Sequence, residues 1–221
     1  GAVMEIDAAT RRNLELNLTL TGSVKNSLLG IIDRTLTGPG ARLLRMHLAA
    51  PSTDLADIIL RLDMVQHFTD SDYLRNGIRD ILKHCPDMER ALSRLTLGRG
   101  GPRDLGAIGN GLKAGAKMRA LLKKVEQDSC VSLEIPEGII CTLSNLGSHN
   151  KIIERLACAL SFELPLYARD GGFIAPEYSP KLDELRALRD ESRRLITELQ
   201  AHYGKITGVQ ALKIKHNNVL G

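Results

Sequence analysis

The spacing of hydrophobic and polar residues changes twice along this chain. Residues 13–20 (NLELNLTL) alternate strictly between polar and apolar side chains. A period of two predicts an extended strand with one apolar face. From about residue 28 to residue 162, apolar residues recur every three or four positions, which predicts a series of amphipathic helices.

Local signals mark where these helices start and stop. Thr37 stands where an N-cap is expected before Pro39, and Pro102 is expected to open a helix that runs to about Glu126. Gly98 is expected to end the helix before it. Further helix starts are predicted at residues 52–54, 72 and 86–87.

The most regular segment lies near the C-terminal end. Its apolar positions step by three and four residues in turn, through Leu185, Leu188, Ser192, Leu195 and Leu199. This spacing is typical of a seam along which one helix packs against another as in a coiled coil. After Gly208 the period returns to two, which predicts a strand that includes Leu212, Lys213, Ile214 and Lys215.

The pattern therefore predicts a mainly α fold: a helical core bundle with a long lever helix and short strands near both chain ends. We expect a helical core domain over residues 1–179. The lever helix is expected over residues 180–207, and a final strand over residues 208–221.

Composition agrees with a folded, soluble chain. Of the 221 residues, 43% are hydrophobic and 25% charged, which excludes a disordered tail, a collagen-like repeat and a disulfide scaffold. Aromatic residues are only 3%, which favours helices over strands. No signal peptide and no apolar run of membrane-spanning length is present, so we expect a cytoplasmic protein with no membrane partner. The chain begins with Gly and ends in a strand-like segment, which suggests a piece of a longer protein.

Signals for catalysis are weak. No phosphate-binding loop and no hydrolase or metalloprotease motif is present. The four cysteines form no C-x-x-C pair, and only His84 beside Cys85 suggests a ligand or nucleophile pair. An enzyme that uses Cys85 and His84 is a poorly supported hypothesis, so no catalytic, cofactor-binding or metal-binding residue is predicted.

A basic segment is the main candidate for a binding function. Residues 99–124 contain seven lysines and arginines and one acid, Asp104. Lys113, Lys117 and Lys124 recur at helical spacing on one side of the predicted helix, where they can contact phosphates. Lys213 and Lys215, on the final strand, are further candidates for DNA contacts. An ordinary solvated face explains the same residues. No aromatic residues are interleaved with them, so stacking on single-stranded nucleic acid is not expected.

Several segments, taken in order, resemble one family. They are residues 6–16 (IDAATRRNLEL), 27–35, 37–44 (TGPGARLL), 58–65, 87–90 (DMER), 93–99, 102–105 (PRDL), 169–174 (RDGGFI), 182–186 (LDELR) and 212–221. Together they resemble the core region of the MutS family of DNA mismatch repair proteins. Pro39, Gly100 and Gly101 depart from the family pattern, and residues 128–150 match it poorly.

The resemblance implies a helical core whose lever helix runs towards a DNA clamp. In this reading residues 208–221 are the first strand of a truncated β clamp. The clamp and a returning lever helix would lie outside this chain. The family's mismatch-reading Phe-x-Glu motif is absent, and its ATPase site belongs to another domain. We therefore expect no catalysis and no cofactor in this fragment, with ATP and Mg implied for the full-length protein, a DNA-dependent ATPase.

The partners implied by the resemblance are mismatched double-stranded DNA, a second copy in a homodimer, and MutL. Without its returning partner, residues 185–199 are expected either to dimerise between chains or to fray. The alternative function is a free-standing helical module that binds nucleic acid or acts as a scaffold, using the basic helix 103–126.

Overall fold

The computed structural model describes residues 3–127, 135–209 and 211–214. The chain divides into two compact units, Gly1–Phe173 and Ile174–Gly221. The described residues form helices and loops, which confirms the mainly α class. Their one β pairing is an isolated antiparallel bridge between Val3 and Ser52. Within these described ranges, no helix is both long enough and apolar enough to cross a membrane.

Helix starts in the first unit follow the capping signals. α3 (Gly38–Ala49) begins after Thr37, whose hydroxyl accepts a hydrogen bond from the Gly40 N–H. α4 (Leu55–Asp70), α5 (Asp72–Lys83) and α6 (Met88–Thr96) begin in the same way after Asp54, Ser71 and Asp87. A side-chain oxygen at the N-cap satisfies one of the N–H groups that the first turn leaves unpaired. The starts predicted near these residues are confirmed.

The strand predicted over residues 13–20 is wrong. α1 (Ala8–Asn13) ends at its first residue, and Glu15 has a left-handed backbone with φ of 48°. The carbonyls of Glu15 and Leu16 accept hydrogen bonds from the first two N–H groups of α2 (Leu28–Ile32). Leu16 is buried beside them. A strand needs a neighbouring strand to pair its backbone. None is found among the described residues, so this segment turns around the start of α2 instead.

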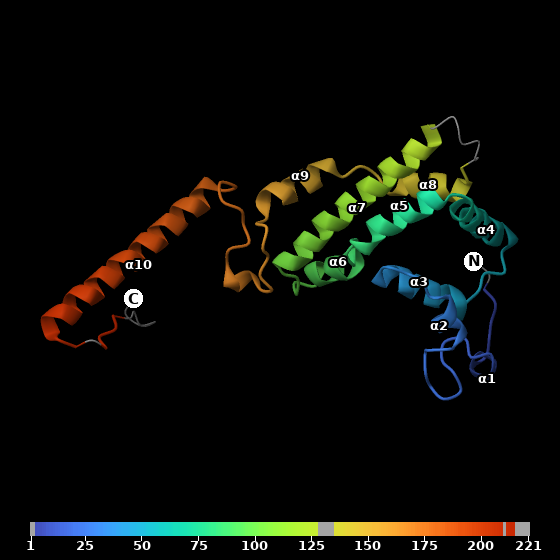
Figure 1. Cartoon of the computed structure of the whole chain (residues 1–221), viewed down its shortest axis with the longest axis horizontal. Coiled ribbons are helices and arrows are strands. Elements are labelled where there is room, and N and C mark those ends of the chain that lie inside the picture. Colours follow the sequence, from blue (N-terminus) through green and yellow to red (C-terminus); the bar gives the residue numbers. More distant parts are fainter. Residues whose placement is uncertain (1–2, 128–134, 210, 215–221) are drawn as a thin grey trace. The chain divides into compact units, whose positions relative to one another are not determined.

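α7 (Pro102–Gln127) packs against α5, α6 and α9 (Asn150–Ala159), as Figure 1 shows. Pro102 opens it, as predicted. The neighbouring helices approach closely where α7 carries glycine. A Cβ atom at Gly111 would lie 2.0 Å from Sδ of Met88 on α6, and one at Gly109 would lie 3.5 Å from Leu156 on α9.

The main apolar cluster fixes how α7 lies relative to its neighbours. Leu74 of α5, Leu122 of α7, and Ile139 and Leu143 of α8 (Glu137–Asn145) are its buried members. Side chains of α4 pack against the same cluster. Burying these side chains removes apolar surface from water and holds α5 beside α7. The face of α7 that carries the lysines is therefore positioned by this core.

The second unit consists chiefly of α10 (Pro180–Thr207), a helix of 28 residues. Its start is held by Asp183, which accepts hydrogen bonds from the Glu177 N–H at 2.8 Å and from Arg186 at 3.0 Å. Gly208 ends it with φ of 71°, a conformation that suits glycine. No residue of α10 is buried, and the apolar seam from Leu185 to Leu199 is exposed.

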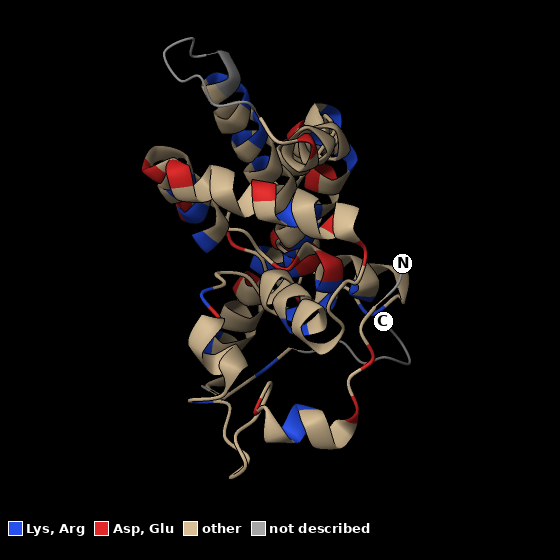
Figure 2. Cartoon of the chain, turned by 90° about the vertical axis from the view of Figure 1, so that its right-hand side faces the viewer, with Lys and Arg blue, Asp and Glu red and all other residues tan. Residues whose placement is uncertain are grey.

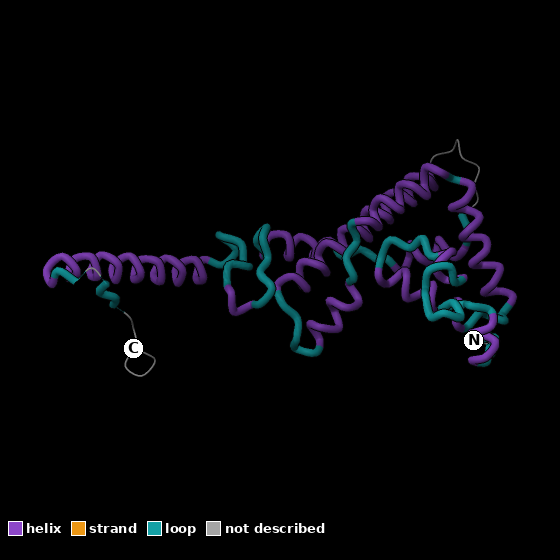
Figure 3. The backbone as a smooth tube through the Cα atoms, turned by 60° about the horizontal axis from the view of Figure 1, so that its bottom comes forward, coloured by secondary structure: helices purple, strands orange, loops and turns teal. Residues whose placement is uncertain are grey.

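The strand predicted after Gly208 is not found either. Residues 211–214 form a turn and an irregular segment, and the Ile214 N–H donates to the side-chain oxygen of Gln200 on α10. Figure 3 shows helix and loop, and no strand, in the described parts of the chain. As in the N-terminal segment, the described residues offer no partner strand. Residues 215–221 lie outside the described residues.

Candidate nucleic-acid interface

The candidate interface is built on α7. Lys113, Lys117 and Lys124 are exposed, and the helix runs without a break through all three. Because these positions differ by four and seven residues, they lie on one side of the helix. Figure 2 shows lysine and arginine recurring along the C-terminal part of α7, the helix that leads up to the grey trace.

Two of the three lysines share a hollow with α5. Lys113 and Lys117 line a space of about 490 Å³ together with Asn110 of α7 and with Asp80 and His84 at the end of α5. Asp80 is paired with Lys83 at 2.7 Å. The hydrogen bond and charge of Lys83 lower the pKa of the Asp80 carboxyl. The Asp80 carboxylate therefore stays charged, but Lys83 partly offsets its negative charge, and the hollow keeps the positive charge of the two lysines.

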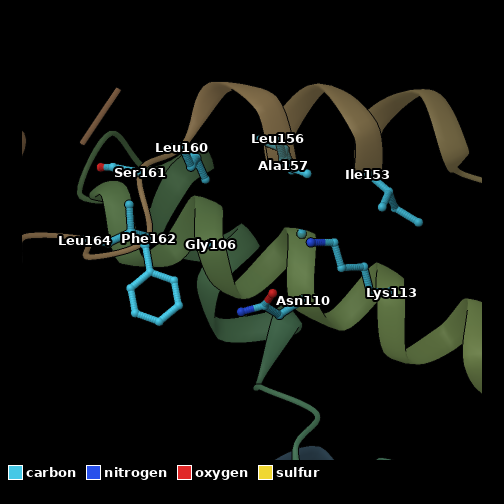
Figure 4. A pocket seen from close by; sticks show the side chains of 11 residues that line it. Gly106, Asn110, Lys113, Ile153, Leu156, Ala157, Leu160, Ser161, Phe162 and Leu164 are labelled. Atoms are coloured by element: carbon cyan, nitrogen blue, oxygen red, sulfur yellow. The ribbon is translucent and has the colours of Figure 1, made fainter. Parts of the chain in front are cut away.

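Lys113 also reaches a second hollow, of about 360 Å³, between α7 and α9. Figure 4 shows its side chain extending into the space between these helices, with Asn110 beside it and Ile153 and Leu156 on α9. Phe162, at the far end, is fully exposed. Lys113, Asn110 and Ser161 supply the polar side chains of this hollow, and its other lining residues are glycine or apolar.

Of the other three candidate lysines, Lys124 and Lys213 do not line the hollow of Lys113 and Lys117. Lys124 is exposed further along α7 and lines neither hollow. Lys213 is exposed and belongs to the second compact unit. Lys215 lies outside the described residues. The structure therefore joins Lys113 and Lys117 in one hollow, and DNA contact by any of the five lysines stays a prediction.

Two arginines of the basic segment have structural partners instead. Arg103 donates from Nε to the Leu164 carbonyl at 2.9 Å, and Arg119 donates from Nη1 to the Gly147 carbonyl. Asp104, the acid of the segment, pairs with Arg94 at 3.2 Å. His84 is a neighbour of the lysines that sequence reasoning missed in this role. Only the packing of α5 on α7 brings it there, and no local sequence signal reports that packing.

Comparison with known proteins decides the family. The model of MutS domain III matches residues 9–212. The chain belongs to the MutS family. It is 51% identical over its whole length to the DNA mismatch repair protein MutS of Paracoccus denitrificans, of which it covers 24%. It is 50% identical over its whole length to that of Rhizobium meliloti, of which it covers 23%. Over 99% of its length it is 48% identical to that of Roseobacter denitrificans, of which it covers 24%. The chain thus spans about a quarter of the length of these relatives.

The geometry of this MutS-family chain does not favour the thiol hypothesis. Burial raises the pKa of the Cys85 thiol, which favours the protonated form over the nucleophilic thiolate. His84 is turned to the Asp80 carbonyl, with Nδ1 at 3.1 Å from that oxygen. Among residues 3–127, 135–209 and 211–214, no three His, Cys, Asp or Glu side chains are grouped to hold a metal ion.

Proposed function

We propose that this chain is the core and lever part of a MutS-like DNA mismatch repair protein. In this proposal it links the ATPase of that protein to its DNA-binding clamp and mismatch-reading domains, and it has no catalysis of its own. The carrying observation is the match to MutS domain III over residues 9–212 together with the exposed apolar seam of α10. The alignment supports the family, and the seam supports a role as a connecting element.

The linking role rests on the physical character of α10. At about 1.5 Å per residue, its 28 residues span roughly 42 Å. Its flanks are mixed charges held in local pairs, such as Arg194 with Glu191 at 3.3 Å and Glu198 at 3.6 Å. A stiff helix with a single apolar seam can change its packing partner as a unit, because packed interfaces switch between discrete arrangements.

The proposal extends to the whole protein through its relatives. They are DNA mismatch repair proteins by name, so mismatched double-stranded DNA is the proposed substrate of the parent. ATP with Mg, a homodimer, MutL and a cytoplasmic location are further parts of the proposal that come from the family resemblance. In this scheme the chain itself holds neither nucleotide nor metal.

Breaking the rigidity of α10 tests the linking role. In the full-length parent, two glycines inserted after Arg193 interrupt the helix, while two inserted after Gly208 serve as the matched control outside it. We expect the first insertion to leave basal ATP hydrolysis and DNA affinity in place and to abolish the change in hydrolysis that DNA causes. Unchanged stimulation by DNA in that variant would refute the linking role.

The alternative is a free-standing nucleic-acid-binding module that uses the basic helix 103–126. The observation that favours it is the shared hollow of Lys113 and Lys117. It predicts that labelled duplex DNA binds the 221-residue chain with an affinity that falls steeply between about 50 and 200 mM salt. Charge reversal of Lys113, Lys117 and Lys124 should weaken this binding, whereas reversal of the exposed Lys181 should not.

Fluorescence anisotropy with matched and mismatched duplexes decides between the two functions. Absence of binding at either salt concentration favours a pure connector, with DNA contact made elsewhere in the parent. Mismatch-blind, salt-sensitive binding that the charge reversals abolish favours a phosphate-tracking surface on α7.

A further inference from the structure

A small hollow lies where α7 meets the loop that leads into α9. Its volume is about 270 Å³, and its polar lining comes from Arg119, Lys123, Ser148, His149 and Asn150. No Asp or Glu is among its lining residues in the described part of the chain. It differs in this from the hollow of Lys113 and Lys117, which contains Asp80. The local charge is therefore positive and has no internal counter-ion.

Arg119 is held in place at the inner side of this hollow. Its Nη1 donates to the Gly147 carbonyl, which fixes the plane of the guanidinium. Its Nε is buried and has no hydrogen-bond partner. Its Nη2 makes no hydrogen bond to any described residue. The buried Nε is out of reach of an external acceptor. Arginine has five N–H donors and cannot shed its charge, so the Nη2 end of this group keeps donors and charge for such an acceptor.

The start of α9 adds further donors at the same place. His149 is its N-cap and makes no side-chain capping bond. The Ile152 and Ile153 N–H groups donate to the His149 carbonyl. Within the described residues the N–H groups of Asn150 and Lys151 and the Ser148 hydroxyl have no partner. Free N–H groups at a helix start carry partial positive charge and suit an anion.

We propose that this hollow is a binding site for a phosphate group. Arg119 and Lys123 supply charge-assisted hydrogen bonds, which are the strong contacts that recognise phosphate oxygens. Ser148 and the first N–H groups of α9 supply the neutral donors. The phosphate comes either from a nucleic-acid backbone or from a small phosphomonoester.

This site is separate from the lysine face already described. Lys113 and Lys117 line the hollow on the α5 side of α7, whereas Arg119 and Lys123 line the one beside the α8–α9 loop. The proposal therefore does not depend on DNA contact by the first set. The two sets can also be tested independently by substitution.

Titration of the 221-residue chain with inorganic phosphate, followed by heteronuclear NMR, tests the site. Chloride replaces phosphate at constant ionic strength in the reference samples. We expect saturable shifts of the backbone amides of residues 148–151. Lys123→Gln should weaken the apparent affinity about fivefold, as expected for loss of one charge-assisted contact. Lys124→Gln, the next residue on the same helix but outside the hollow, should leave it unchanged.

Two results would overturn the site. The first is amide shifts that do not saturate with phosphate. The second is an equal loss of phosphate affinity in Lys123→Gln and Lys124→Gln, which indicates general attraction to the helix. Arg119→Lys keeps the charge but loses the fixed guanidinium, and it should also weaken binding. A short DNA duplex and a nucleoside monophosphate then identify the source of the phosphate. If the duplex shifts the same amides, the ligand is a backbone phosphodiester. If only phosphate and the monophosphate do so, it is a phosphomonoester.

Discussion

The Asp87 carboxylate has two structural roles. Asp87 caps α6 by accepting a hydrogen bond from the Arg90 N–H at 3.1 Å. It also accepts two hydrogen bonds from Arg42 of α3, at 2.7 and 3.0 Å, while Glu89 accepts a third from Arg42 at 2.6 Å. A two-point contact between guanidinium and carboxylate fixes geometry better than a point charge does. The pair therefore joins α3 to the start of α6.

Replacing Arg42 should weaken the fold. We expect Arg42→Ala to lower the urea concentration at the midpoint of unfolding, because the variant loses a two-point contact that is partly open to solvent. Urea unfolding measures the change. Arg45→Ala is the control, since Arg45 is exposed on the same helix and makes no ion pair with any described residue. Equal losses in the two variants would contradict a specific contact.

Acid should remove the stability that Asp87 provides. Hydrogen bonds from Arg42 lower the pKa of the Asp87 carboxyl in the folded chain. The unfolded chain therefore binds the proton first as pH falls. The contribution is complete above the unfolded pKa of about 4 and is lost as pH falls through the lower folded value. Asp87→Asn, which keeps a capping side chain, should show a smaller fall in urea midpoint between about pH 5 and pH 3. An identical fall would show that Asp87 does not contribute.

At the scale of elements, α7 depends on small residues where its neighbours approach. A Cβ atom at Gly111 would lie 2.0 Å from Sδ of Met88, whereas one at Gly109 would be at an ordinary distance of 3.5 Å from Leu156. Gly109→Ala should therefore stabilise the chain by about 0.5–1 kcal/mol, the usual gain for glycine to alanine within a helix.

Gly111→Ala should have the opposite sign. The same helix gain is outweighed because Met88 has to move, and overpacking of this kind costs about 1–3 kcal/mol. Thermal unfolding of the two variants compares them directly. If both alanines stabilise the chain, the contact between α6 and α7 is looser than described.

The seam of α10 predicts concentration-dependent behaviour. Because Leu188 and Leu195 are exposed, burial of the seam requires a partner helix. In dilute monomer the amides of α10 should exchange with solvent much faster than those of α7. At high concentration the chain should dimerise, and Leu195→Glu should prevent it while Glu191→Ala on the charged flank should not. Strong protection of α10 in a dilute monomer would contradict this prediction.

At the scale of the whole molecule, the buried residues found in the described ranges all belong to the first compact unit. The apolar cluster joins α4, α5, α7 and α8, whereas α10 contains no buried residue. A chain that ends at Phe173 should therefore keep the unfolding free energy of the longer chain to within about 0.5 kcal/mol. Urea denaturation of both chains measures the difference. Loss of cooperative unfolding in the shorter chain would show that α10 supports the core.

A structural feature could be predicted from the sequence where the residues that produce it lie close together along the chain. Thr37, Asp87, Pro102 and Gly208 mark helix ends by contacts within a turn, so these ends of α3, α6, α7 and α10 could be predicted closely, whereas α1 was not predicted. The ordered motifs also sufficed for the family resemblance, which the match to MutS domain III confirms.

Features that depend on distant residues could not be predicted in this way. The alternation of residues 13–20 is compatible with a strand, but the backbone of a strand is satisfied only by a neighbour, and Leu16 pairs with the start of α2 instead. The lysine spacing on α7 follows from helical geometry alone. By contrast, Lys113 and Lys117 share a hollow with His84 only because α5 packs against α7.

The capped helices from α3 onward and the family therefore follow from the amino-acid sequence, because their signals are local or ordered along the chain. Which charged groups share a hollow follows only from the packed fold. Close approach of neighbouring helices around Gly109 and Gly111 sets which helices meet α7, and that packing places Arg119 beside the start of α9.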